Sequence, residues 1–279
     1  MLSEVNRICE VFDGLRERGR AAVMPFLTAG DPDLETTAAL LPAIERAGAS
    51  VCEIGIPFSD PIADGPVIQA SMTRALDRGV RPGEVLDAVA DLRAKVDLGL
   101  IAMVSYSIVY RRGWTQFLKA AKAAGIDGFI FPDLPVEESS DVIKAVADLD
   151  MVCSMLVSPT TPLDRAERIA KASSGFVYVL ARSGLTGEQD SLPPGLNERI
   201  RCLRGVTDLP MAVGFGIANA DQVRQVAQVA DAVIVGSAIM RRITTHTNQP
   251  RANLVEDVER FVADLCGGLD PLPTEASTD

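Results

Sequence analysis

Residues 34–56 read LETTAALLPAIERAGASVCEIGI, and this segment contains the unit from which the rest of the chain is built. Leu34–Ala47 has apolar residues at helical spacing. Val51–Ile56 is a short apolar run without clean polar alternation, as expected for a parallel strand that is covered on both faces. Between them lies Gly48, which suits the left-handed residue that ends a helix. The same junction recurs at Ala124-Gly125-Ile126 and Ser174-Gly175-Phe176.

Eight such units follow one another along the chain. The runs rich in Val and Ile that we expect to be strands are Ala22–Thr28, Val51–Ile56, Leu98–Val104, Gly128–Phe131, Val152–Val157, Phe176–Leu180, Met211–Val213 and Ala232–Val235. The clearest helical segments are Leu34–Ala47, Pro82–Lys95, Thr115–Ala124, Ser139–Leu149, Leu163–Ser173, Leu196–Gly205, Asp221–Val229 and Val255–Leu265. The alternation predicts an α/β fold, a single-domain (β/α)8 TIM barrel. A doubly wound open sheet is the alternative, although no GxGxxG follows the first strand.

We expect the barrel domain to span residues 1–266, and residues 267–279, which are polar and hold two prolines, to be a short disordered tail. No apolar run approaches the ~20 residues of a membrane-spanning helix. The N-terminus has no basic stretch followed by an apolar core, so a signal peptide is not expected. These features predict a cytoplasmic protein that does not enter the membrane.

Charge and residue usage exclude several classes of site. Lys and Arg number 27 against 38 Asp and Glu, and the net charge of −11 argues against binding nucleic acid or an anionic membrane. The five cysteines form no CxxC pair, so thiols are expected rather than a zinc or redox motif. The single histidine, His246, rules out a multi-histidine metal site and is interpreted as part of a polar loop.

Glu53 is the first candidate for chemistry. It interrupts an apolar run, between Cys52 and Ile54. Burying a carboxylate is costly unless it is paired or protonated, so its pKa should be raised, which suits a general acid–base. A structural carboxylate that caps neighbouring backbone amides is the alternative.

Asp60 and Asp64 follow in the loop after the same run. With Glu53 they make three carboxylates within twelve residues, a set that can hold Mg²⁺. The competing interpretation is that they stabilise turns, because aspartate often bonds its own backbone. From spacing alone the turn is favoured for Asp60, and Asp64 is left open.

Two glycine-containing loops follow the last two strands. The seventh strand leads into Gly214-Phe215-Gly216 and the eighth into Gly236-Ser237. Glycines here let the backbone approach a ligand, and a short helix after each strand points its amide groups at it, an arrangement with which barrels bind phosphate. Tight strand–helix turns are the alternative.

Other features at the predicted barrel mouth are less specific. Residues 182–194 form a long polar loop after the sixth strand, which is either functional or simply solvated. Phe26, Tyr106 and Tyr178 lie at or near strand ends and can enclose a planar apolar group, or serve in ordinary packing.

Together these residues resemble the alpha subunit family of tryptophan synthase over roughly residues 5 to 265. The longest matching motif runs from Glu53 through Gln69 and contains GIPFSDPIADGP. The other matching motifs, in order, are Phe26–Pro32, Asp133–Glu138, Arg182–Gly187, Gly214–Ile217 and Gly236–Ile239.

The resemblance implies a (β/α)8 barrel that acts as a carbon–carbon lyase in tryptophan biosynthesis. It cleaves indole-3-glycerol phosphate to indole and glyceraldehyde 3-phosphate. The indole passes to a beta subunit, which carries pyridoxal phosphate, within an alpha2-beta2 assembly (a heterotetramer). The alpha chain itself needs no cofactor or metal, so the resemblance argues strongly against Mg²⁺ binding by the three carboxylates.

The resemblance also assigns roles to individual residues. Glu53 is implied as the general acid–base and Asp64 as the partner of the indole N–H, while Asp60 belongs to a loop that senses the beta subunit. Thr186 is implied to bond Asp64 when the loop closes. The implied phosphate-binding residues are Gly187, Phe215, Gly216, Gly236 and Ser237, and those implied to line the indole pocket are Phe26, Tyr106 and Tyr178.

One departure from the family affects the expected docking of the partner. After Tyr106 the chain reads Ser107-Ile108-Val109-Tyr110, where many members have Asn two residues after the tyrosine. A stand-alone indole-3-glycerol-phosphate lyase, which would use the same catalytic residues, is kept as an alternative. A non-catalytic barrel is a second one, but Glu53, Asp64 and both glycine loops are intact, which argues against it.

Overall fold

The computed structural model describes residues 5–61, 64–181, 195–214 and 216–270. Within them all neighbouring strands are parallel, in the order β5-β4-β3-β2-β1-β9-β8-β7-β6. The strands are β1 (Ala22–Thr28), β2 (Val51–Gly55), β3 (Gly99–Met103), β4 (Gly128–Ile130), β5 (Val152–Cys153), β6 (Leu156–Val157), β7 (Val177–Leu180), β8 (Met211–Gly214) and β9 (Ala232–Val235).

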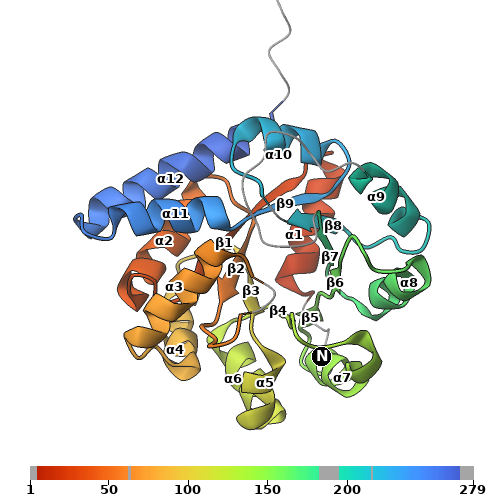
Figure 1. The fold of residues 1–279 in the computed structure, drawn as a ribbon, viewed down its shortest axis with the longest axis horizontal. Coiled ribbons are helices and arrows are strands. Elements are labelled where there is room, and N and C mark those ends of the chain that lie inside the picture. The colour runs from red at the N-terminus through yellow and green to blue at the C-terminus, as the bar shows by residue number, and fades with distance from the viewer. Residues whose placement is uncertain (1–4, 62–63, 182–194, 215, 271–279) are drawn as a thin grey trace, which may run out of the picture.

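The sheet closes on itself through the segment that contains β5 and β6. The amide of Ser154 donates to the carbonyl of Phe129 on β4 at 2.9 Å, whereas the carbonyl of Met155 accepts from the amide of Tyr178 on β7 at 3.1 Å. The single strand expected over Val152–Val157 is therefore two short pieces, because the chain changes its pairing partner at this point. Eight strand segments complete the ring, and the prediction of a (β/α)8 barrel is confirmed (Figure 1).

Helices surround the ring of strands (Figure 1). They are α1 (Arg7–Glu17), α2 (Leu34–Arg46), α3 (Pro66–Asp77), α4 (Pro82–Arg93), α5 (Tyr106–Arg111), α6 (Trp114–Ala124), the 3-10 helix η1 (Val136–Glu138), α7 (Ser140–Ala147), α8 (Leu163–Ala172), α9 (Leu196–Arg204), α10 (Ala220–Ala227), α11 (Ser237–His246) and α12 (Arg251–Gly267). His246 ends α11 and its ring is half-buried, so the polar-loop interpretation of this residue is wrong.

The helix α1 was not expected, and it packs against the barrel from outside the strand–helix alternation. Its buried residues Ile8, Phe12 and Leu15 recur at helical spacing. A Cβ on Gly99, the first residue of β3, would lie 3.0 Å from Ile8 Cγ1, so this end of the strand is in close contact with α1. Because a closed sheet is covered inside and outside, every residue of β1, β2 and β3 is buried.

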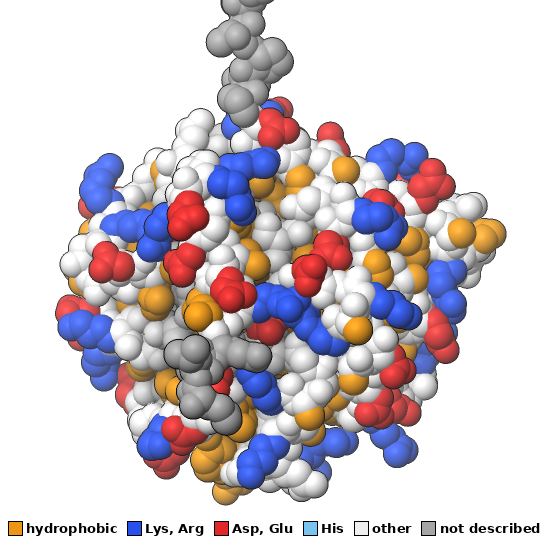
Figure 2. Space-filling view, turned by 180° about the vertical axis from the view of Figure 1, so that it is seen from behind, with side chains coloured by type: hydrophobic (Ala, Val, Ile, Leu, Met, Phe, Trp, Pro, Cys, Tyr) orange, Lys and Arg blue, Asp and Glu red, His pale blue; other side chains and the backbone are white. Residues whose placement is uncertain are grey.

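The outer surface carries charges of both signs. On the face drawn in Figure 2, acidic and basic side chains are interspersed, so the excess negative charge does not gather there into one patch. No helix among the described residues is long and apolar enough to cross a membrane. The predicted tail lies largely outside the described residues, since α12 continues to Gly267 and the description ends at residue 270.

Candidate active site

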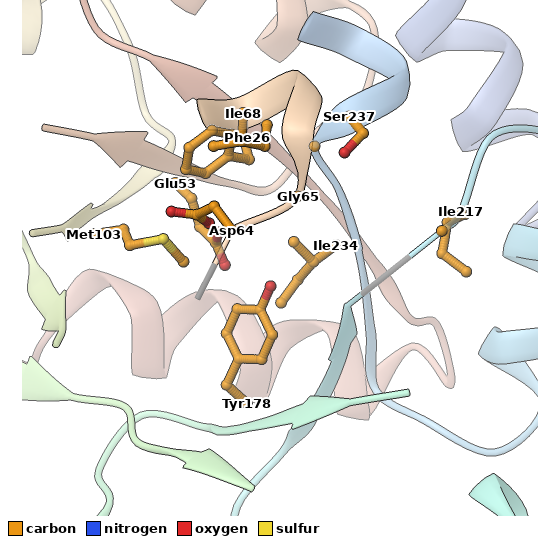
Figure 3. Close-up of a pocket in the computed structure, with 12 residues that line it drawn as sticks. Phe26, Glu53, Asp64, Gly65, Ile68, Met103, Tyr178, Ile217, Ile234 and Ser237 are labelled. Carbon is orange, nitrogen blue, oxygen red and sulfur yellow. The ribbon is translucent and has the colours of Figure 1, made fainter. Parts of the chain in front are cut away.

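A pocket of about 480 Å³ opens at the carboxyl ends of the strands, the end of the barrel where such folds place their active sites. Its lining comes from β1, β2, β3, β7 and β9 and from the first turns of α3 and α11 (Figure 3). The lining residues are Phe26, Glu53, Asp64, Gly65, Ile68, Met103, Tyr178, Gly216, Ile217, Ile234, Gly236 and Ser237.

Glu53 lies on the inner face of β2 and is fully buried. It pairs in register with Phe26 on β1 and with Ile101 on β3. Neither of its carboxylate oxygens has a hydrogen-bond partner among the described residues. Burial, and secondly the charge of Asp64, raise the pKa of Glu53 well above its ordinary value. This carboxyl group therefore keeps its proton to higher pH than an ordinary glutamate does, and its oxygens are available to a ligand.

Asp64 approaches Glu53 from a different element, the connection between β2 and α3 (Figure 3). Gln69 fixes the backbone of this connection, because its side-chain amide donates to the carbonyls of Asp64 at 2.8 Å and of Pro61 at 3.2 Å. Burial raises the pKa of Asp64 from 3.8 to about 6. The pocket therefore contains two carboxyl groups that lose their protons at different pH values, which suits one as proton donor and the other as a fixed charge.

Two aromatic rings stand on opposite sides of the carboxyl groups. The hydroxyl of Tyr178 points into the pocket, with Phe26 across from it (Figure 3). Burial raises the pKa of Tyr178 well above its ordinary value, so the phenol stays neutral. Glycines make room for both rings: a Cβ on Gly55 would lie 2.5 Å from Phe26 Cζ, and one on Gly214 would lie 2.8 Å from Tyr178 Cζ.

The room at Gly214 gives a testable prediction. Gly214→Ala should force the Tyr178 ring to move into the pocket, raising the KM of the chain for its substrate about 10-fold and destabilising the fold by about 1–3 kcal/mol. Steady-state kinetics and urea unfolding measure the two effects. Gly83→Ala is the control, because nothing lies within 4 Å of that Cβ. Unchanged kinetics in Gly214→Ala would contradict a role for the ring in forming the pocket.

Tyr106 lies outside the pocket that contains the two carboxyl groups. It is the first residue of α5, and its ring contacts Phe131 and Tyr110 with centroids 6.1 and 6.0 Å away. Asp133 caps this helix: one carboxylate oxygen accepts from the Tyr106 amide at 2.7 Å and the other from Ser105 Oγ at 2.6 Å. The position of Tyr106 therefore depends on how α5 begins. Met103, at the end of β3, lines the pocket in this region.

The expected phosphate loops are described in part. Gly236 and Ser237 line the pocket where α11 begins, so the free amides of the first turn face the ligand space. Gly216 joins them from the loop after β8 with a φ of 80°, a left-handed conformation that favours glycine. The predicted residues Thr186, Gly187 and Phe215 lie outside the described residues.

Asp60 is exposed and does not line this pocket; its carboxylate accepts from Ser59 Oγ at 2.6 Å. No group of three or more His, Cys, Asp or Glu side chains that could hold a metal ion is found in the described part of the chain.

Asp60 borders a second pocket of about 670 Å³, which shares Asp64 and Met103 with the first. Apolar residues dominate the new wall, which includes Ile56, Phe58 and Pro132.

Four apolar residues of the pocket were not predicted: Ile68, Met103, Ile217 and Ile234. Strand register could have identified two of them. Met103 lies two residues after Ile101, the neighbour of Glu53 on β3, and Ile234 pairs with Met24, which shares a face with Phe26. Ile68 lies in the first turn of α3, the helix that Asp64 and Gly65 directly precede.

Comparisons with known proteins agree along almost the whole chain. The family model described as tryptophan synthase alpha chain matches residues 12–266. The tryptophan synthase alpha chain of Thermosynechococcus vestitus is 46% identical over 240 residues, covering 86% of this chain and 90% of that protein. The one from Rhodopirellula baltica is 44% identical over 265 residues, covering 93% and 95%.

Solved structures give the same answer. The tryptophan synthase subunit alpha of Legionella pneumophila superposes with a TM-score of 0.85 at 31% identity, covering 95% of this chain and 98% of that one. A chain of the aminoacrylate-bound tryptophan synthase from M. tuberculosis gives 0.83 at 30% identity, with 95% and 100% covered. The chain therefore belongs to the tryptophan synthase alpha chain family.

Proposed function

We propose that this chain cleaves indole-3-glycerol phosphate to indole and glyceraldehyde 3-phosphate, with Glu53 as general acid–base. Family membership makes the chain an enzymatic subunit. The observation that carries the specific reaction is the fully buried Glu53 carboxyl, which has no hydrogen-bond partner among the described residues and shares its pocket with Asp64.

The chemistry needs one group that both gives and takes a proton. Protonation of indole C3 by the Glu53 carboxyl makes the ring a leaving group. The resulting Glu53 carboxylate then removes the proton from the hydroxyl group on the substrate's glycerol carbon that is bonded to C3. The carbon–carbon bond then breaks, its electron pair returns to the ring, and the hydroxyl carbon becomes the aldehyde. Glu53 ends as it began, and its raised pKa keeps it protonated for the first step.

The charge that develops in this reaction requires a second carboxylate. As C3 is protonated, the ring becomes an indoleninium whose N–H carries positive charge. Asp64, with a pKa of about 6, is largely ionised at pH 7 and can stabilise this N–H. Phe26, Ile68 and Met103 supply apolar walls for the flat ring.

At the other end of the substrate we assign the phosphate to the backbone around Gly216, Gly236 and Ser237. Binding energy there, remote from the reacting bond, orients the rest of the substrate. The predicted contributions of Thr186, Gly187 and Phe215 belong to the same assignment. Tyr106 packs on Phe131 and is not among the lining residues of either pocket, and its expected contact with the indole ring stays a prediction.

The indole product would pass to a beta subunit in an alpha2-beta2 assembly, and pyridoxal phosphate would belong to that partner. The solved relative from M. tuberculosis is a tryptophan synthase, which supports such a partner. The apolar second pocket, which adjoins Asp64 and opens beside Asp60, is compatible with an exit for indole on that side. We place the assembly in the cytoplasm, as expected for this biosynthesis.

The test is indole release from indole-3-glycerol phosphate by the purified chain, with and without a tryptophan synthase beta subunit. We expect the chain alone to release indole slowly. With the beta subunit the rate should rise about 10-fold or more, because the energy of binding the partner helps to hold the active site in its reactive arrangement. Fast release that the partner does not change would contradict the subunit role and favour a stand-alone lyase. No release in either condition would overturn the proposed reaction.

A further inference from the structure

The helix α3 determines where Asp64 lies. Asp64 and Gly65 directly precede this helix, and Ile68 in its first turn also lines the pocket. Gly65 occupies the N-cap position and provides no side-chain hydrogen bond to the first turn. The start of the helix is therefore not fixed by a capping side chain at Gly65. The side-chain amide of Gln69 on α3 donates to the Asp64 carbonyl at 2.8 Å, so the position of Asp64 follows that of α3.

Two polar contacts join α3 to the end of β1 and the loop that follows. The hydroxyl groups of Ser71 and Thr28 are 2.6 Å apart. The guanidinium of Arg74 donates twice to Asp31, from Nε to Oδ1 at 2.9 Å and from Nη2 to Oδ2 at 2.7 Å. Ser71 and Arg74 are three residues apart, so both lie on the side of the helix that faces β1.

These contacts are buried although they are polar. Thr28, Asp31 and Ser71 are each at most 1% exposed, and the Arg74 side chain is 33% exposed. A buried ion pair contributes little net stability compared with apolar residues of the same shape, because both charges lose their hydration. The pair instead fixes geometry. Two parallel hydrogen bonds hold the planar guanidinium of Arg74 and the carboxylate of Asp31 at one distance and in one orientation.

Both elements that this pair joins carry residues of the pocket. β1 carries Phe26, the strand neighbour of Glu53, and α3 follows Asp64 directly. Arg74 Nη2 also donates to Thr244 Oγ1 at 2.8 Å on α11, the helix that begins beside Gly236, although this contact is exposed.

We propose that Arg74 is a positioning residue for the cleavage reaction: by pairing with Asp31 it holds α3, and thereby the Asp64 carboxylate, at the place that the reaction requires relative to Glu53. The inference rests on the proposed function. Arg74 does not line the pocket, so it acts through Asp64 and not on the substrate.

The test compares Arg74→Lys with a matched control pair elsewhere. Lysine keeps the positive charge but cannot form the two parallel hydrogen bonds. Arg46 makes the same paired contact with Glu259, at 3.0 Å and 2.6 Å, between α2 and α12. Arg46 ends α2, which runs back from the pocket end, so it lies toward the opposite end of the barrel. Arg46→Lys should leave indole release within about two-fold, as usual for a surface site.

We expect Arg74→Lys to lower kcat for indole release about 10-fold, as small misplacements of catalytic groups do, while KM changes less than about three-fold. The decisive measurement repeats Arg74→Lys in an Asp64→Asn background. If Arg74 acts through Asp64, its effect there should shrink to less than about two-fold, because effects through one group are not additive. A merely structural role would lower activity equally in both backgrounds and would overturn the inference, as would an unchanged kcat in the single variant.

Ser71→Ala provides a second variant that leaves the buried charge pair untouched. It should lower kcat in the same direction by a smaller factor, and again only while Asp64 is present. Equal losses with and without Asp64 would contradict the inference. A wild-type chain that releases no indole would overturn the proposed function itself, whereas an active wild type with an unaffected Arg74→Lys variant would overturn only the role of Arg74.

Discussion

Glu53→Gln should abolish cleavage of indole-3-glycerol phosphate, lowering kcat by at least about 10³-fold, within the range that general acid–base groups contribute. Glutamine keeps the shape of the side chain but can neither release nor accept the proton. Binding should change little, with the dissociation constant within about three-fold of wild type, because the phosphate end and the apolar walls remain. Rapid-quench assays of indole and calorimetric titration with substrate measure the two quantities.

Glu167→Gln is the matched control for this change. Glu167 lies on α8, is partly exposed and pairs with Lys171 four residues on, so its loss should leave kcat unaltered. Residual activity of Glu53→Gln above about a hundredth of wild type would show that another group transfers the proton, since loss of a general acid–base costs at least about 10²-fold. Equal loss of activity in both variants would point to damaged folding instead.

Most of the barrel could be predicted because its strands are buried on both sides, and such strands stand out as continuous apolar runs. Ala22–Thr28 and Ala232–Val235 have the predicted bounds. The break at Ser154 and Met155 could not be predicted, since it depends on a change of pairing partner that leaves no mark on local hydrophobicity. The helix α3 was hidden behind Asp64-Gly65-Pro66, which is typical of a turn, although proline is also favoured at the first position of a helix.

For the site, residues whose chemistry conflicts with their surroundings were the easiest to identify. Glu53 interrupts an apolar strand in the sequence. In the structure its carboxyl group is buried and has no hydrogen-bond partner among the described residues, so the charged residue type and the apolar surroundings disagree there as well. Met103 and Ile234 were missed because an apolar residue at a strand end resembles any core residue. Tyr106 was expected to line the indole pocket as a residue near a strand end; it is the first residue of α5, its amide donates to Asp133, and its contact with a ligand stays a prediction.

Asp64→Asn should lower kcat about 10²-fold, because the developing charge on the indole N–H then meets a neutral amide instead of a carboxylate. It should also stabilise the fold at high pH. Burial raises the pKa of Asp64 from 3.8 to about 6, so the folded protein binds this proton more tightly than the unfolded chain does. The wild type then loses about 3 kcal/mol between about pH 3 and pH 7 through this group, at about 1.36 kcal/mol per unit of pKa.

The sign of the pH dependence follows from the same difference. Well below pH 3.8 the carboxyl is protonated in both states, and the wild type and Asp64→Asn should be almost equally stable. As the pH rises from 3.8 to about 6 the unfolded chain loses this proton while the folded chain keeps it, so the variant gains its advantage in this range; above 6 both states are ionised and the advantage stays constant. Urea unfolding at pH 4, 6 and 8 measures it, with the exposed Asp148→Asn on the surface ion pair with Lys144 as control. An advantage for Asp64→Asn that does not grow with pH would show that Asp64 is solvated in the folded chain, and would leave its carboxylate too weakly held to stabilise the indoleninium.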